Sequence, residues 1–140
     1  MDSVDYVNTF ITVAPDSAAD AGSAPPAKES PTVAERMHAM IVDAPYVHTS
    51  GDVIFTVWAD RRDIPEAERP ASRAEFFSKG QACLRSSDLG KRYGWGVHSD
   101  AEGRVAIYGI DSPEYAAFAR GTSPIDGTEV TVRPAMRSKR

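Results

Sequence analysis

Hydrophobic and polar residues alternate in the first stretch of the chain, VDYVNTFITV at residues 4–13. One face of an extended chain there carries Val7, Thr9, Ile11 and Val13, and the other carries Tyr6, Asn8, Phe10 and Thr12. A period of two predicts a strand. Residues 15–31 have no period and are rich in Pro, Gly, Ser and Ala. They predict a long loop that is either mobile or folded over something.

The next two segments predict a helix and then a strand. Apolar residues recur at spacings of three and four over 33–44, which indicates an amphipathic helix that ends near Pro45. Thr32 and Glu35 have the spacing of a capping box at its start. The run DVIFTVWAD at 52–60 is apolar on both faces. We expect it to form a central strand that is covered on both sides.

A second helix is predicted over 63–79, with Asp63 as its cap and Gly80 just after its end. Pro70 lies inside this segment, so we expect a kink or a restart there. A short strand at 82–85 would follow, and then a helical turn that begins at Ser86 or Ser87.

The last third of the chain predicts a hairpin at 93–108 around the turn SDAEG, with Gly103 in a left-handed conformation. Ser112 would cap a short helix with Pro113 in its first turn, and residues 127–134 would form a last strand. This order predicts one α+β domain over 1–140, with a mixed or antiparallel sheet of about five strands packed by two or three helices. The predicted domain also includes the long loop at 15–31 and a basic tail at 135–140.

Composition narrows the classes of function. The chain has 140 residues and a formal net charge of −4, which disfavours indiscriminate binding to nucleic acid or to an anionic membrane. No stretch predicts a membrane span or a targeting signal. Cys83 is the one cysteine, which is typical of a reducing compartment, so we expect a cytoplasmic protein. The preference for arginine over lysine suggests a bacterial source.

The segment FFSKGQACLRSSDLGKRYGWGVHS at 76–99 gathers basic side chains around a predicted helical turn. Such a turn beside an arginine can hold an anion. In the strand that follows, alternate glycines would leave a trough without side chains, open to a ligand or to another element of the fold. The residues predicted to bind a small anionic molecule are Lys79, Arg85, Ser86, Ser87, Lys91, Arg92, Gly94, Trp95 and Gly96. The alternative is a set of solvated surface charges.

Two side chains in this segment are candidates for catalysis. His98 would stand at the end of the trough and has a usual pKa near neutrality, although a half-exposed structural histidine is the alternative. Cys83 could act as a nucleophile beside Arg85, or it could be an inert buried thiol. His38, His48 and His98 have no recognised ligand spacing, so no metal is predicted, and no cofactor motif is present.

Several longer motifs resemble a bacterial family of domains of unknown function, the family numbered 6157. They are YVNTFI at the start, APY.HTS.DV.F.V.A.R at 44–61, FFSKGQAC.RSS at 76–87, KRYGWG.HSD.EGR.A.Y at 91–108 and AMRSKR at the end. The resemblance implies a single-domain protein of this length and implies no activity. The chain departs from the family pattern at Pro70 and in GTSPIDGTEVTVRP at 121–134.

Three classes of function therefore stay open at this point. The first is a binder of a small anionic ligand near residues 79–98, with or without a catalysed reaction. The second is a protein-interaction or homo-oligomeric module, for example a homodimer, whose glycine trough receives a partner. The third is a nucleic-acid binder that uses Arg133, Arg137, Lys139 and Arg140 together with the basic cluster of 76–99, and the net acidity disfavours it.

Overall fold

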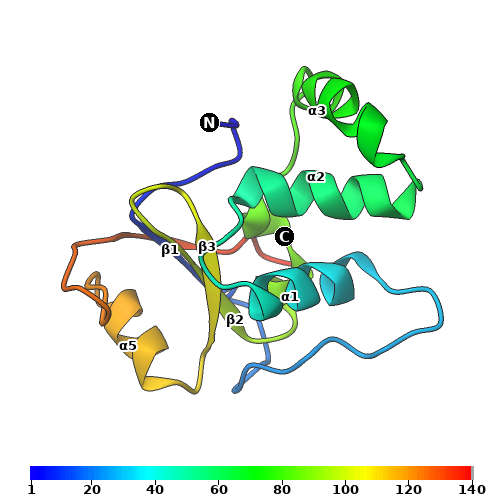
Figure 1. The fold of residues 1–140 in the computed structure, drawn as a ribbon. Helices are drawn as coiled ribbons and strands as arrows, with labels where there is room; N and C mark the ends of the chain where they lie inside the picture. The colour runs from blue at the N-terminus through cyan, green and yellow to red at the C-terminus, as the bar shows by residue number, and fades with distance from the viewer. Residues whose placement is uncertain (140) are drawn as a thin grey trace.

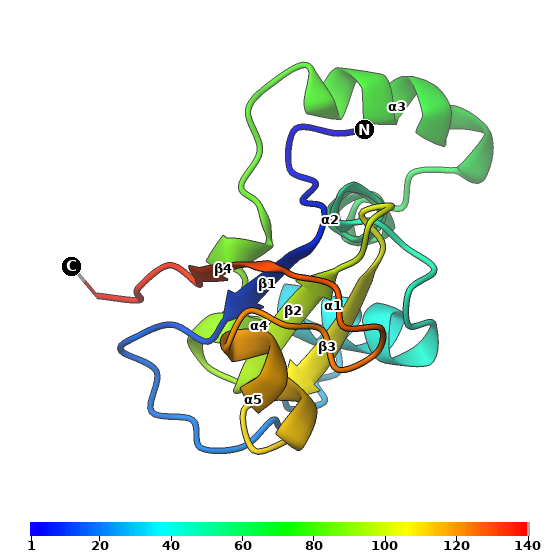
Figure 2. The same ribbon diagram turned by 90° about the vertical axis from the view of Figure 1, so that its left-hand side faces the viewer.

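The computed structural model describes residues 1–139, and Arg140 of the predicted basic tail lies outside the described residues. A four-stranded mixed sheet forms its centre, with the strands in the order β3-β2-β1-β4 (Figure 2). The strands are β1 (Thr9–Thr12), β2 (Trp95–Ser99), β3 (Val105–Gly109) and β4 (Thr131–Pro134). The β1–β2 and β2–β3 pairs are antiparallel, and β1 and β4 run parallel. The α+β class with a mixed sheet is confirmed, with four strands.

Helices cover both sides of this sheet. They are α1 (Val33–Asp43), α2 (Ser50–Arg61), α3 (Arg69–Phe77), α4 (Asp88–Lys91) and α5 (Pro113–Ala119), with 3-10 turns at Glu66–Glu68 and Leu84–Ser86. In Figure 1, α1 and α2 lie on one side of the sheet and α5 lies on the other. The helix α3 packs on α2 at the edge of the molecule, away from the sheet (Figure 1).

The segment at 52–60 corrects the sequence prediction, because it lies in α2 and not in a strand. The Thr49 hydroxyl accepts from the Asp52 amide at 3.1 Å, and the Asp52 carboxylate accepts from the Thr49 amide at 2.9 Å. This capping box begins the helix. Both faces are apolar because the helix is enclosed: Val53 and Val57 join the main core, and Phe55 packs with Phe76 of α3.

The segment between α2 and β2 also differs from its prediction. Asp63 caps no helix and has a φ of 51°. The helix restarts at Pro70, as expected, with a 3-10 turn before it, and α3 ends at Phe77, short of Gly80. Residues 82–85 form no strand, because Leu84 begins a 3-10 turn.

The hairpin turns, and α4 and α5 begin, at the residues predicted for them. Gly103 has a φ of 79° in the turn between β2 and β3. The Ser112 hydroxyl accepts from the Tyr115 amide at 3.2 Å and caps α5, with Pro113 in the first turn. Ser87 caps α4 in the same way through the Leu89 amide, at 3.1 Å.

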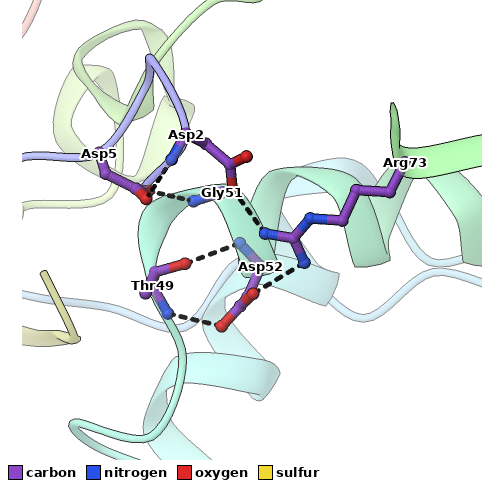
Figure 3. Close-up of polar contacts among 6 residues, drawn as sticks. All are labelled: Asp2, Asp5, Thr49, Gly51, Asp52 and Arg73. Atoms are coloured by element: carbon purple, nitrogen blue, oxygen red, sulfur yellow. Dashed lines mark hydrogen bonds and ion pairs between the residues drawn. The ribbon is translucent and has the colours of Figure 1, made fainter. Parts of the chain in front are cut away.

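The N-terminal segment is fixed to α2 and α3 by carboxylates (Figure 3). The Asp5 carboxylate accepts from the Gly51 amide at the start of α2, at 2.7 Å. Arg73 of α3 donates to Asp2 at 2.6 Å and to Asp52 at 2.8 Å. A Cβ at Gly51 would overlap the Asp2 carboxylate, so only glycine allows this approach. These contacts hold α3 to the rest of the fold.

Candidate functional site

The side chain of His98 lies on the face of the sheet that α5 covers. Its strand β2 pairs it with Phe10 of β1 and Ala106 of β3. The residue is 5% exposed, and its ring centroid lies 4.3 Å from that of Phe118 on α5. The aromatic neighbours shield the imidazole from water and fix the plane of its ring.

A chain of hydrogen bonds runs from His98 through two tyrosines. The Tyr46 hydroxyl lies 2.8 Å from Nδ1 of His98 and 2.8 Å from the hydroxyl of Tyr108. Tyr46 comes from the connection between α1 and α2, and Tyr108 comes from β3. A hydroxyl has only one proton to donate. If Tyr46 donates its proton to Nδ1, its oxygen must accept a hydrogen bond from the Tyr108 hydroxyl. The directions of these two hydrogen bonds are therefore coupled to the tautomer of the imidazole: when Nδ1 carries the proton, it donates to Tyr46 and Nε2 is the acceptor nitrogen.

Tyr46 occupies a strained backbone conformation, with a φ of 60°. A non-glycine residue held there costs about 1–3 kcal/mol, and such residues are concentrated at functional sites. Its amide donates to the Val105 carbonyl at 2.9 Å, and its hydroxyl has the two partners described above. These three bonds hold the residue in place and turn its side chain toward His98.

Burial is the main influence on the protonation of His98 and Tyr46 in this hydrogen-bonded chain. It lowers the pKa of His98 below the usual value, although Asp100 and Asp126 nearby raise it. Burial and the neighbouring Tyr108 hydroxyl raise the pKa of Tyr46 far above its usual value. At neutral pH the imidazole is therefore neutral and Tyr46 keeps its proton. A neutral imidazole offers one nitrogen as acceptor and the other as donor.

His98 also lines a pocket of about 230 Å³. The other lining residues are Asn8, Asp100, Ala101, Glu102, Asp126 and Thr128. Within residues 1–139 we find no hydrogen-bond partner for Nε2 of His98, and the only fully buried side-chain polar atoms without a partner are the hydroxyls of Ser50 and Ser99. Nε2 is therefore the ring nitrogen of His98 that has no partner among the described residues.

The rim of this pocket is acidic and fixed by turns. Asp100 Oδ1 accepts from the amides of Glu102 and Arg104, each at 2.9 Å. Asp126 accepts from the Thr128 amide at 2.9 Å, and these contacts lower the pKa of its carboxyl. Three carboxylates on the rim attract a cation or a hydrogen-bond donor and repel an anion.

The residues predicted from the sequence to form one site are spread over several surfaces. Lys79 lines a pocket of about 280 Å³ beside Trp58. Arg85 lines a pocket built with the C-terminal segment, and Lys79, Lys91 and Arg92 do not line that pocket. The Arg92 guanidinium lies over the ring of its neighbour Tyr93, 5.9 Å from the centroid. The anion-binding role of these basic residues stays a prediction.

Cys83, Ser86 and Ser87 line a different pocket, of about 220 Å³ and mostly apolar, beside Met37 of α1. The Cys83 sulfur lies 3.4 Å from the hydroxyl of Tyr6. Burial and this contact with Cys83 raise the pKa of Tyr6, so the tyrosine stays protonated beside the thiol. A nucleophilic role for Cys83 stays a prediction.

The trough predicted at Gly94 and Gly96 is filled by other parts of the chain, which is the second of the two occupants expected for it. A Cβ at Gly94 would overlap the Ala21 carbonyl, and one at Gly96 would overlap the rings of Phe10 and Tyr115. The indole N–H of Trp95 donates to the Ser23 carbonyl at 2.8 Å. The loop at 15–31 is thus folded over the end of the hairpin, the second of the two outcomes expected for it.

The sequence-based search found His98 and missed both tyrosines. Tyr108 had a usable signal, because the hairpin register places it opposite Gly96 and hence diagonal to His98 on the same face. Tyr46 had none, because its side chain reaches His98 only through the path of the connection between α1 and α2.

No three His, Cys, Asp or Glu side chains in residues 1–139 gather closely enough to hold a metal ion. In the same residues, no helix has both the length and the apolar composition to cross a membrane.

A model of a protein family matches residues 1–140, the whole chain, and that family is described as a family of unknown function, DUF6157. The chain belongs to the family DUF6157. No curated protein and no solved structure matches this DUF6157 chain. Membership carries no activity with it, so any functional conclusion depends on the geometry of the site.

Proposed function

We propose that this protein binds a small polar molecule in the His98 pocket and that His98 exchanges a proton with it as a general acid or base. One observation carries the proposal: the Tyr108–Tyr46–His98 chain engages Nδ1, Nε2 has no partner within residues 1–139, and His98 lines a pocket. A base that is held by a second group and is neutral at working pH is the arrangement that acid–base catalysis requires.

The acidic rim defines the class of molecule. Asp100, Glu102 and Asp126 favour a ligand that is neutral or positively charged and that has an amine or hydroxyl to donate. The volume of about 230 Å³ favours a small ligand, because it lies below the range of pockets that hold drug-sized molecules. The acidic rim disfavours an anionic ligand in this pocket. Anion binding at the surface around Arg85 is a separate question. A cytoplasmic location stays a prediction from the free thiol of Cys83.

Modification with diethyl pyrocarbonate at pH 6–7 tests the accessibility that the proposal needs, because the reagent attacks neutral imidazole nitrogens. We expect His98 to be carbethoxylated, with the sites assigned by mass spectrometry and the half-exposed His48 as an internal reference. A His98→Gln variant should lose that modified peptide alone. A His98 that stays unmodified while His48 reacts to completion would overturn the proposal.

Protection by ligands tests the chemical class. A panel of small primary amines and polyols should contain members that slow modification of His98 and leave the rate at His48 unchanged. The Asp126→Asn variant should lose most protection by the amines, because one carboxylate of the rim is gone. If organic anions protect His98 and the amines and polyols do not, the assigned ligand class is wrong.

A further inference from the structure

The C-terminal segment is held to the body of the protein by its backbone. The Pro134 carbonyl accepts from Nε of Arg85 at 2.8 Å, and the Met136 amide donates to the Arg85 carbonyl at 2.7 Å. Between these contacts, the Ala135 amide donates to the Thr12 carbonyl at 2.9 Å. In Figure 2 this segment leaves β4 and continues away from the sheet. Its first residues are thus part of the fold and not a free tail.

Asp16 fixes the next part of the segment. Its carboxylate accepts from the Ser138 amide at 3.1 Å and from the Lys139 amide at 3.0 Å. These contacts with backbone amides lower the pKa of the Asp16 carboxyl, so it is ionised at neutral pH. The negative charge of Asp16 holds the backbone of a segment whose side chains are positive.

The result is a pocket of about 540 Å³ with three cations on its wall. The lining residues are Pro15, Arg85, Pro134, Ala135, Met136, Arg137, Ser138 and Lys139. The cations are Arg85, Arg137 and Lys139, from two segments about 50 residues apart in the sequence, and within residues 1–139 none of them forms an ion pair. Like charges held together repel each other, and a bound anion would remove that repulsion.

We propose that Arg85, Arg137 and Lys139 form a binding site for a small molecule with a phosphate or carboxylate group. A guanidinium offers two parallel donors to either group. Nε of Arg85 donates to the Pro134 carbonyl, which aligns the guanidinium at the pocket wall, and the Tyr6 hydroxyl lies beside the same guanidinium. Pro15, Pro134 and Met136 add apolar surface for an organic part, and the pocket is within the size range of small-molecule sites. Of the basic residues that the sequence predicted to bind an anion, Arg85 belongs to this pocket and Lys79, Lys91 and Arg92 do not line it.

Isothermal titration calorimetry with inorganic phosphate, pyrophosphate and citrate at low salt tests this site. We expect saturable binding of at least one of the three, weakened at least about tenfold in Arg85→Gln, because a charge-assisted hydrogen bond contributes about 1.5–3 kcal/mol. Arg120→Gln, an exposed arginine of α5's end with the same change in charge, should leave the affinity within about twofold. Equal losses in the two variants, or no saturable binding of any probe, would overturn the proposal.

The Asp16→Ala variant separates a built pocket from a sum of charges. Removing a negative charge near three cations should strengthen anion binding if only the net field matters. If the pocket depends on the position of the C-terminal segment, the same variant should weaken binding several-fold. Circular dichroism spectra and melting temperatures of all variants confirm that they fold. A gain in affinity in Asp16→Ala would contradict the built site.

A short single-stranded DNA oligonucleotide is the last probe. The proposal expects it to bind no more tightly than pyrophosphate at the same ionic strength. Tighter, steeply salt-dependent DNA binding without saturable binding of the small anions would replace this proposal with a nucleic-acid surface.

Discussion

The two faces of the central sheet are built differently. Toward α1 and α2 the sheet contributes Ile11, Val97 and Val105 to a cluster that includes Leu84 and Leu89, all buried and apolar. Toward α5 it contributes Phe10 to an aromatic cluster, and His98, Tyr46 and Tyr108 are bonded to each other beside that cluster.

The difference lies in what covers each face. Two helices of 11 and 12 residues cover the first face, whose core is mostly apolar although the buried Ser99 lies on the same side of β2 as Val97. The second face has the 7-residue α5, and its remaining edge is covered by connecting segments that contain Tyr46 and Asp126. Connecting segments bring polar side chains, so the pocket beside His98 is lined mostly by polar residues, whereas the pocket beside Met37 on the helix-covered side is mostly apolar. The first face therefore provides stability, and the second provides the candidate site.

The largest expected effect is on the apolar face. Leu89→Ala should lower the free energy of unfolding by about 2–5 kcal/mol, because Leu89 is fully buried and its loss leaves a cavity. Urea unfolding followed by circular dichroism measures it. Val42→Ala, on the exposed side of α1, should change stability by less than about 0.5 kcal/mol. Similar small losses in both variants would contradict the tight packing of this face.

On the aromatic face, Gly96→Ala should cost about 1–3 kcal/mol, because its Cβ would overlap the rings of Phe10 and Tyr115. Gly80→Ala is the matched control, since a Cβ there meets no atom within 4 Å. Differential scanning calorimetry of the two variants gives the comparison. If the variants are equally stable, the glycine trough is open and Phe10 and Tyr115 do not pack against Gly96.

Tyr46→Phe should lower the free energy of unfolding by about 1–3 kcal/mol, because it leaves Nδ1 of His98 and the Tyr108 hydroxyl without a partner. The nitrogen chemical shifts of His98 should show a changed tautomer population. Tyr93→Phe removes a hydroxyl to which we assign no hydrogen bond within residues 1–139, and it should leave both readouts unchanged. An unaltered His98 spectrum in Tyr46→Phe would show that the hydroxyl does not set the tautomer.

The smallest effect is a shift in titration. NMR should give a pKa for His98 below about 6.5, the usual value, because burial disfavours the charged imidazolium. Since the unfolded chain then binds a proton that the folded protein does not, stability from this group is present above about pH 6.5 and falls as the pH drops from there toward the folded pKa. Asp126→Asn removes a charge that raises this pKa, so it should lower it further. A higher pKa in Asp126→Asn would show that the carboxylate does not act on His98.

Local patterns were reliable where the chain interacts with its near neighbours. Thr32, Ser87 and Ser112 cap helices as their spacing predicted, although Glu35 accepts from Lys28 and does not complete its capping box. The turn at Gly103 and the restart at Pro70 are also as predicted. Each of these features depends on interactions between residues a few positions apart, so the local sequence is enough to predict it.

The run at 52–60 shows where pattern alone is ambiguous. An apolar run without clear periodicity is compatible with a buried strand and with a buried helix. The Thr49–Asp52 capping box identifies the helix. The outer face of α2 is also apolar because it packs against the aromatic residues of α3, Phe76 and Phe77.

The sequence by itself determined the class of the fold, the caps at Thr32, Ser87 and Ser112, the hairpin and the candidacy of His98 and Arg85. Only the tertiary structure decided their partners: Tyr46 and an acidic rim for His98, and the C-terminal segment for Arg85. The physical reason is distance along the chain. Helix caps and turns depend on neighbouring residues, whereas Tyr46 and His98 lie 52 residues apart and meet only when the sheet and its connections close around them.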